Sequence, residues 1–130
     1  MRDEEPAAGE GVFPSGRFTV EIPPVPDADT DVLLIAGELD RDTMAPLSAA
    51  LEAHVGAGRV VVDCTALAFC DSSGLNALLR ARLKALEGGG RVELVGLRPP
   101  VDRMFEITGV RSVFRVYETL GEALAEGTTP

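Results

Sequence analysis

The four residues Asp71-Ser72-Ser73-Gly74 bring a carboxylate and two hydroxyls to the point where an apolar run meets an amphipathic segment. A serine hydroxyl is a nucleophile when a nearby base takes its proton, and it accepts a phosphoryl group when a kinase acts on it. Asp and Ser are also favoured helix N-caps, and Gly tolerates a tight turn. Helix capping, catalysis and phosphorylation are therefore the roles that this stretch could serve.

Nucleophilic catalysis lacks its partner groups in this sequence. No G-x-S-x-G motif surrounds either serine, and His54 is the single histidine. A helix is expected to begin just after Asp42, which places His54 at its far end, about 15 Å from Ser72. With no base in reach, neither Ser72 nor Cys70 is expected to be activated, and we expect the protein not to be an enzyme.

Metal binding is the next chemistry to consider. Four aspartates could supply oxygen ligands for Mg²⁺, namely Asp40, Asp42, Asp63 and Asp71. No phosphate-cradling glycine loop or lysine accompanies them. Zinc usually needs four ligands, and Cys64, Cys70 and His54 are too few. We therefore expect no metal and no cofactor, and two reduced cysteines of which at least one is buried.

Phosphorylation fits the expected position of the serines best. Free N–H groups and the positive end of the helix dipole attract anions, so a phosphate at a helix start should not unfold the domain. It would add a charge of about −1.5 to −2 beside Asp71 and Asp40. Such a change spares the fold and disrupts an interface, which is the behaviour of a switch.

Strand and helix patterns alternate along the chain that positions these residues. The expected strands cover 18–22, 32–39, 59–64, 91–97 and 113–117. The expected helices cover 43–55, 73–86, 99–109 and 119–127, and a short connector covers 65–69. The alternation predicts an α/β fold with a mixed, mostly parallel sheet of about five strands and about four helices. The first strand should be an antiparallel edge, because no helix follows it.

Two of the expected helices carry apolar stripes at three- and four-residue spacing. The first stripe contains Met44, Leu47, Leu51 and Val55. The second contains Leu75, Leu78, Leu79, Leu83 and Leu86. We expect both stripes to face the core.

In a parallel sheet, the loops that follow the strands lie at one edge of the sheet. The loops 37–43, 68–74 and 97–100 should therefore meet there. The residues that this arrangement makes neighbours are Asp40, Asp71, Ser72 and Ser73, with Arg98 as a further candidate. We predict that this edge is the functional site.

Composition limits the partners and the location. The net charge is −9, and residues 1–31 contribute −6 of it with eight acids and two arginines. This balance and the low aromatic content argue against nucleic acid as a partner. No apolar stretch is long enough to span a membrane and the N-terminus is unlike a signal peptide, so we expect a cytoplasmic protein. Residues 1–16 are predicted to be a disordered acidic tail before one domain over 17–127.

Four segments between residues 18 and 126 together resemble one family. They are "IAGELD", "VVVDCTALAFCDSSGLNALL", "GGRVELVGLRPPVDRMFEITGV" and "FRVYETLGEAL". The chain resembles the STAS-domain family of anti-sigma factor antagonists. The resemblance implies the STAS fold, with the D-S-S-G-L turn in register with the G-E-L-D strand before it.

The resemblance also implies a mechanism. Ser72 corresponds to the serine that is phosphorylated by an anti-sigma factor, a serine kinase with a histidine-kinase-like ATPase fold. The unphosphorylated domain would bind that kinase and release a sigma factor, and a PP2C-type phosphatase would reverse the modification. ATP and Mg²⁺ would belong to the kinase. The residues implied at the partner-facing surface are Asp40, Asp71, Ser73, Gly74 and Asn76.

Three alternatives stay open at the sequence level. Ser73 competes with Ser72 as the acceptor, and the family register favours Ser72. A STAS subunit of an ABC-type lipid transporter, which binds its ATPase, would share the fold. A scaffold subunit of a stress-signalling assembly usually carries a large N-terminal sensor domain, which seventeen residues are too few to build.

Overall fold

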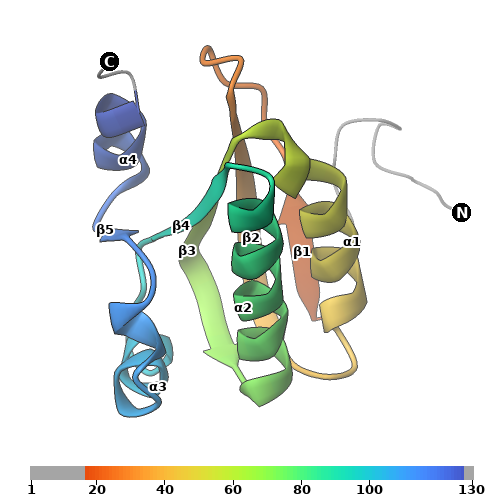
Figure 1. Cartoon of the computed structure of the whole chain (residues 1–130). Helices are drawn as coiled ribbons and strands as arrows, with labels where there is room; N and C mark the ends of the chain where they lie inside the picture. The colour runs from red at the N-terminus through yellow and green to blue at the C-terminus, as the bar shows by residue number, and fades with distance from the viewer. Residues whose placement is uncertain (1–16, 128–130) are drawn as a thin grey trace, which may run out of the picture.

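The computed structural model describes residues 17–127, so the predicted tail over residues 1–16 lies outside the described residues. Within the described part, the strands form one five-stranded sheet in the order β1-β2-β3-β4-β5. The strands are β1 (Phe18–Glu21), β2 (Thr30–Leu39), β3 (Arg59–Cys70), β4 (Arg91–Val95) and β5 (Val116–Tyr117). β1 pairs antiparallel with β2 and the remaining pairs are parallel, which confirms the predicted mixed sheet with an antiparallel edge (Figure 1).

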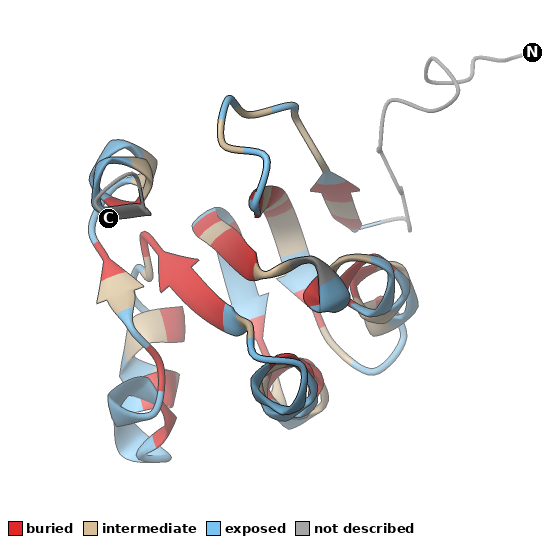
Figure 2. Ribbon diagram, turned by 45° about the horizontal axis from the view of Figure 1, so that its top comes forward, coloured by how far each residue is buried: buried red, intermediate tan, exposed pale blue. Residues whose placement is uncertain are grey.

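Helices cover the two faces of the sheet unequally. They are α1 (Met44–His54), α2 (Ser72–Glu87), α3 (Val101–Ile107) and α4 (Leu120–Gly127), with short 3₁₀ turns η1 (Val55–Ala57) and η2 (Val110–Ser112). α1, α2 and α3 pack on one face and enclose the larger core. α4 packs on the other face, where a smaller core includes Val32, Val61 and Tyr117. Figure 2 shows the buried residues concentrated between these layers.

The segment 65–69, predicted to be a connector, is instead part of β3. β3 contains one more residue than β2 at two places, between Leu34 and Ala36 of β2 and between Gly37 and Glu38. These β-bulges change the spacing of inward-facing residues from two to three. Cys64, Leu67 and Cys70 are buried and the residue pairs between them are exposed. Strict alternation was the pattern expected of a strand, and the bulges hide it.

The apolar stripe of α1 is confirmed, whereas that of α2 is wrong in its second half. Leu83 and Leu86 are 57% and 49% exposed. The buried face of α2 instead continues through Ala77, Ala81 and Ala85. The reason is close packing, because small side chains let the helix approach the sheet and leave no room for a leucine on that face.

Four further predicted elements differ by two residues or more at one end, and one of them is the strand expected over 91–97, which is the shorter β4. β2 begins two residues earlier, at Thr30, whose N–H and hydroxyl both bond to Asp27. The helix expected over 99–109 is the shorter α3. The strand expected over 113–117 retains only its last two residues. Val113 ends the η2 turn, and Phe114 packs into the larger core.

Candidate functional site

The carboxyl ends of β2 and β3 bring two of the predicted site residues together. Leu39 pairs with Cys70, and the Asp71 N–H donates to the Leu39 carbonyl at 3.0 Å. Asp40 and Asp71 are the next residues on these neighbouring strands. The predicted proximity of the two aspartates is therefore confirmed, and α1 and α2 both start from this edge (Figure 1).

Asp71 is the N-cap of α2. Its carboxylate accepts hydrogen bonds from the Ser73 N–H at 2.9 Å and from the Gly74 N–H at 3.2 Å. Its carbonyl accepts the first intrahelical bond, from the Leu75 N–H. These bonds satisfy donors that a helix start otherwise leaves unpaired. Asp71 therefore caps α2, and neither serine hydroxyl is needed as a cap.

The Ser72 hydroxyl is available to other molecules. Ser72 is the first residue of α2 and is exposed, whereas Ser73 is half-buried. Within residues 17–127, no hydrogen bond involves the Ser72 hydroxyl. Asn76, one helical turn further, is exposed as well. Accessibility therefore favours Ser72 over Ser73 as a site for modification.

Gly74 is required for close packing of α2. A Cβ at this position would lie 2.6 Å from Leu39 Cγ and 3.0 Å from Cys70 Sγ. Gly74 is buried and helical, and its φ is not positive, so the turn role expected for it is wrong. The glycine instead lets the first turn of the helix pack directly onto the ends of β2 and β3.

Asp40 organises the start of α1. Its carboxylate accepts hydrogen bonds from the Asp42 N–H at 2.9 Å and from the Thr43 N–H at 3.1 Å. Thr43 is only 3% exposed, and its hydroxyl accepts from the Asp40 N–H and donates to the Glu38 carbonyl. The buried Thr43 hydroxyl therefore stabilises this turn.

Arg17 adds a cation that the sequence pattern did not reveal. Its guanidinium contacts Glu38 Oε1 at 2.7 Å and Asp40 Oδ2 at 2.9 Å. Desolvation acts to raise the pKa of Asp40, but hydrogen bonds from Arg17, Asp42 and Thr43 outweigh it and hold that pKa below its usual value. Arg17 precedes the first strand without any motif around it, so only the antiparallel pairing of β1 with β2 brings it here.

Arg98 follows the end of β4, and its carbonyl accepts a hydrogen bond from the Asp102 N–H at 2.8 Å. β4 ends at Val95, which pairs with Asp63, and β3 then continues for seven residues to Cys70. Seven residues of strand span about 20 Å. Within residues 17–127, Arg98 forms no ion pair with Asp40 or Asp71. β4 thus ends at another level of the sheet than β2 and β3, and the place of Arg98 beside Asp40 and Asp71 stays a prediction.

His54 lies at the opposite end of the sheet from Ser72. Its Nδ1 is 2.7 Å from Oδ2 of Asp31, near the beginning of β2. Asp31 and Leu39 are eight residues apart on this strand, which corresponds to about 26 Å. The single histidine is therefore too far from the serines to act as their base.

The two cysteines are free and buried. Burial, with a smaller contribution from Asp71, raises the pKa of the Cys70 thiol to about 12. Burial raises the pKa of Cys64 as well. Both thiols are protonated at neutral pH, and the nucleophilic thiolate is not formed.

Residues 17–127 contain neither a group of metal-ligating side chains nor a membrane-spanning helix. In that part of the chain, no three His, Cys, Asp or Glu residues are grouped so that they could hold a metal ion. None of its helices is both long enough and apolar enough to cross a bilayer.

Comparison with known proteins gives consistent similarities. Residues 26–120 match the family model described as "Mlab, STAS domain". The chain is 32% identical over 98 residues to the anti-sigma-B factor antagonist of Listeria monocytogenes, covering 74% of this chain and 86% of that protein.

Two solved structures extend the similarity. An anti-sigma factor antagonist from Mycobacterium paratuberculosis has a TM-score of 0.73 and 28% identity, covering 84% of this chain and 92% of that one. The Bacillus cell fate determinant SpoIIAA in its phosphorylated form has a TM-score of 0.66 and 23% identity, covering 82% and 97% of the two chains. The second likeness shows the fold alone.

Proposed function

This chain belongs to the STAS-domain family of anti-sigma factor antagonists, and on that premise we propose that it exchanges partners through phosphorylation of Ser72. The unphosphorylated protein binds an anti-sigma factor and thereby releases a sigma factor. The anti-sigma factor is a serine kinase with a histidine-kinase-like ATPase fold. It phosphorylates Ser72 with ATP and dissociates, and a PP2C-type phosphatase restores the serine.

The exposed hydroxyl of Ser72 is the observation that carries this proposal. It lies at the first position of α2, and within the described residues it makes no hydrogen bond. A kinase can therefore reach it without breaking an interaction of the fold. The phosphorylated SpoIIAA structure supports the idea that this fold accommodates a phosphate.

Asp71 keeps the helix start intact in both states. Its carboxylate caps the Ser73 and Gly74 N–H groups, so phosphorylation does not have to supply a cap. A phosphate on Ser72 would add about −1.5 to −2 charge next to the Asp71 carboxylate. The dipole of α2 offsets part of this charge within the protein. A partner surface that excludes water gains no such compensation, so the partner is released.

The partner-binding surface extends from Ser72 to its exposed and half-buried neighbours. Asp40, Asp71, Ser73 and Asn76 belong to the surface, and the buried Gly74 acts by setting their position. Arg17 neutralises Asp40 on the side facing β1, which leaves Asp71 as the carboxylate nearest to the acceptor hydroxyl.

The direct test is incubation with the candidate kinase and ATP, followed by mass mapping of the modified residue. We expect one phosphate, on Ser72. Ser72→Ala should abolish the modification, whereas Ser73→Ala should still carry its phosphate on Ser72. Phosphate on Ser73, or on another residue of the Ser72→Ala protein, would contradict the assignment.

A pull-down with the unphosphorylated protein tests the class of partner. Recovery of a serine kinase that also binds a sigma factor is the expected result. Recovery of the ATPase of an ABC-type lipid transporter, with no kinase, would replace this proposal with the transport-subunit alternative.

A further inference from the structure

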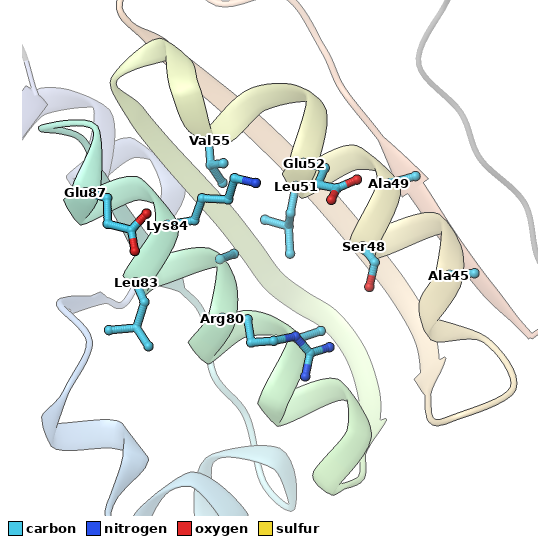
Figure 3. A pocket seen from close by; sticks show the side chains of 12 residues that line it. Ala45, Ser48, Ala49, Leu51, Glu52, Val55, Arg80, Leu83, Lys84 and Glu87 are labelled. Atoms are coloured by element: carbon cyan, nitrogen blue, oxygen red, sulfur yellow. The ribbon is translucent and has the colours of Figure 1, made fainter.

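A groove of about 680 Å³ lies between the outer surfaces of α1 and α2 (Figure 3). Its lining includes two cations, Arg80 and Lys84, and two carboxylates, Glu52 and Glu87. These charges cancel, so the groove selects no charged partner. A surface for a specific partner is better sought close to Ser72, where the proposed modification changes the charge.

Phe69 is an exposed aromatic side chain close to Ser72. It is the last residue but one of β3, and it is 46% exposed. The next residue, Cys70, is buried in the larger core beneath α1 and α2. Successive side chains of a strand point to opposite faces of the sheet, so Phe69 faces away from these helices.

The helix that packs on this second face lies over its other end. α4 shares the smaller core with Val61 of β3. Val61 is eight residues before Phe69, which corresponds to about 26 Å of strand. Figure 1 shows α4 and the end of β3 at opposite ends of the sheet. The face around Phe69 is therefore open to a partner.

The charged groups around this part of the sheet do not balance. Phe69 is the neighbour of Glu38 across the strands, and the Glu38 carboxylate bonds to Arg17. The charged residues grouped at the carboxyl ends of β2 and β3 are Arg17, Glu38, Asp40, Arg41, Asp42 and Asp71. Their net charge is −2 (2 − 4). A partner that covers Phe69 therefore gains from basic side chains around its apolar contact.

We propose that the anti-sigma factor binds across the end of β3 onto this face, with Phe69 in an apolar pocket bordered by arginine or lysine side chains. The inference rests on the proposed function, because it takes Ser72 as the centre of the interface.

The usual size of a protein interface brings Phe69 within it. A standard interface buries about 800 Å² on each partner, which corresponds to a disc about 32 Å across. Phe69 is three residues from Ser72, so the two are at most about 11 Å apart along the chain. A disc of that size centred on Ser72 extends beyond Phe69. Aromatic side chains are also enriched at protein interfaces, since they bury much apolar area.

The test is calorimetric titration of the full, unphosphorylated chain with the serine kinase recovered in the pull-down. Phe69→Ala should raise Kd about tenfold or more, because the pocket loses the side chain that fills it. Phe69→Thr should raise Kd similarly while keeping a residue that favours strands. Phe69→Leu, which keeps an apolar side chain, should retain most of the affinity.

Leu86→Ala is the matched control. Leu86 is exposed to a similar extent, 49%, but it lies about 21 Å from Ser72 along α2, outside the expected interface. Its Kd should equal that of the wild type. Urea denaturation should give all four variants stabilities close to that of the wild type, because both side chains are exposed.

The outcomes separate this inference from the proposed function. Equal Kd values for Phe69→Ala, Phe69→Thr and the wild type would overturn the inference alone. A wild type that binds no anti-sigma factor would overturn the proposed function and the inference with it. Self-association of the wild type that Phe69→Ala abolishes, with unchanged affinity for the kinase, would assign the face to a second copy of the chain and overturn the inference.

Discussion

The starts of α1 and α2, at the carboxyl ends of β2 and β3, contain the same residue types but place the hydroxyl differently. At α1, Asp40 and Thr43 exchange hydrogen bonds, and the threonine hydroxyl is buried. At α2, Asp71 caps the helix without help from a hydroxyl, and Ser72 is exposed. An aspartate with a nearby hydroxyl therefore accompanies a buried, hydrogen-bonded hydroxyl at one start and an exposed hydroxyl at the other.

The difference shows that residue type alone does not decide whether a hydroxyl is accessible. Thr43 is three residues after its aspartate, where its side chain turns back onto the strand end and bonds to the Glu38 carbonyl. Ser72 is one residue after its aspartate and points to solvent. Position within the turn decides whether the hydroxyl is hydrogen-bonded within the fold or is exposed to solvent.

The largest expected effect comes from placing a charge at the start of α2, where Ser72 is exposed. Ser72→Asp should weaken binding of the anti-sigma factor by about 2–5 kcal/mol, or tens to thousands of times in Kd. Calorimetric titration measures the loss, and circular dichroism checks that the fold is retained. Ala53→Asp, with the same charge at an exposed position of α1, should bind as the wild type does. Equal affinity of Ser72→Asp and the wild type would remove the switch.

The next largest effect should be on stability, through the packing of the start of α2. Gly74→Ala places a methyl group against Leu39 and Cys70, and overpacking of this kind should lower the free energy of unfolding by about 1–3 kcal/mol. Urea denaturation measures it. Gly56→Ala is the control, because nothing lies within 4 Å of its added Cβ. Similar stabilities for the two variants would mean that α2 does not depend on close approach.

The stability of the start of α1 should depend on the Thr43 hydroxyl. Thr43→Ala removes the hydroxyl that bonds to the Asp40 N–H and the Glu38 carbonyl, and it should cost about 0.5–2 kcal/mol of unfolding free energy. Ser72→Ala should stay within about 0.5 kcal/mol of the wild type. Chemical denaturation of both proteins compares them directly. If both variants lost the same unfolding free energy, the hydroxyls of Thr43 and Ser72 would not differ in their contribution to the fold.

The smallest expected effect is a pH dependence of the stability that Asp40 contributes at the start of α1. The folded state lowers the pKa of Asp40, so its carboxylate stabilises the fold above the unfolded pKa of about 3.9 and loses this contribution as pH falls through the folded pKa. The Tm of Asp40→Asn should be below that of the wild type at pH 7, and the gap should narrow toward pH 3.

Asp42→Asn is the matched control for this measurement. Within residues 17–127, the Asp42 carboxylate makes no hydrogen bond or ion pair. Its Tm difference from the wild type should therefore be small across the same pH range. A gap for Asp40→Asn that widens as pH falls would reverse the sign that we expect.

Much of the fold was predictable because strand and helix periodicities are local. The alternation of elements from residue 32 onward correctly predicted a mostly parallel sheet, and with it the proximity of Asp40 and Asp71. The extension of β3 was not predictable from alternation, since its bulges replace the period of two with a period of three. The exposure of Leu83 and Leu86 was also missed, because apolar spacing does not say which side of a leucine-rich helix the sheet covers.

The sequence by itself determined the order of the elements, the edge where their loops meet and the residue types available for capping. All three follow from backbone geometry over a few residues. Only the tertiary structure decided that Thr43 is enclosed, that Ser72 is accessible, that Gly74 must lack a side chain and that Arg17 reaches Asp40. These outcomes depend on which distant segments pack together, and burial is a property of the assembled layers, not of any one segment.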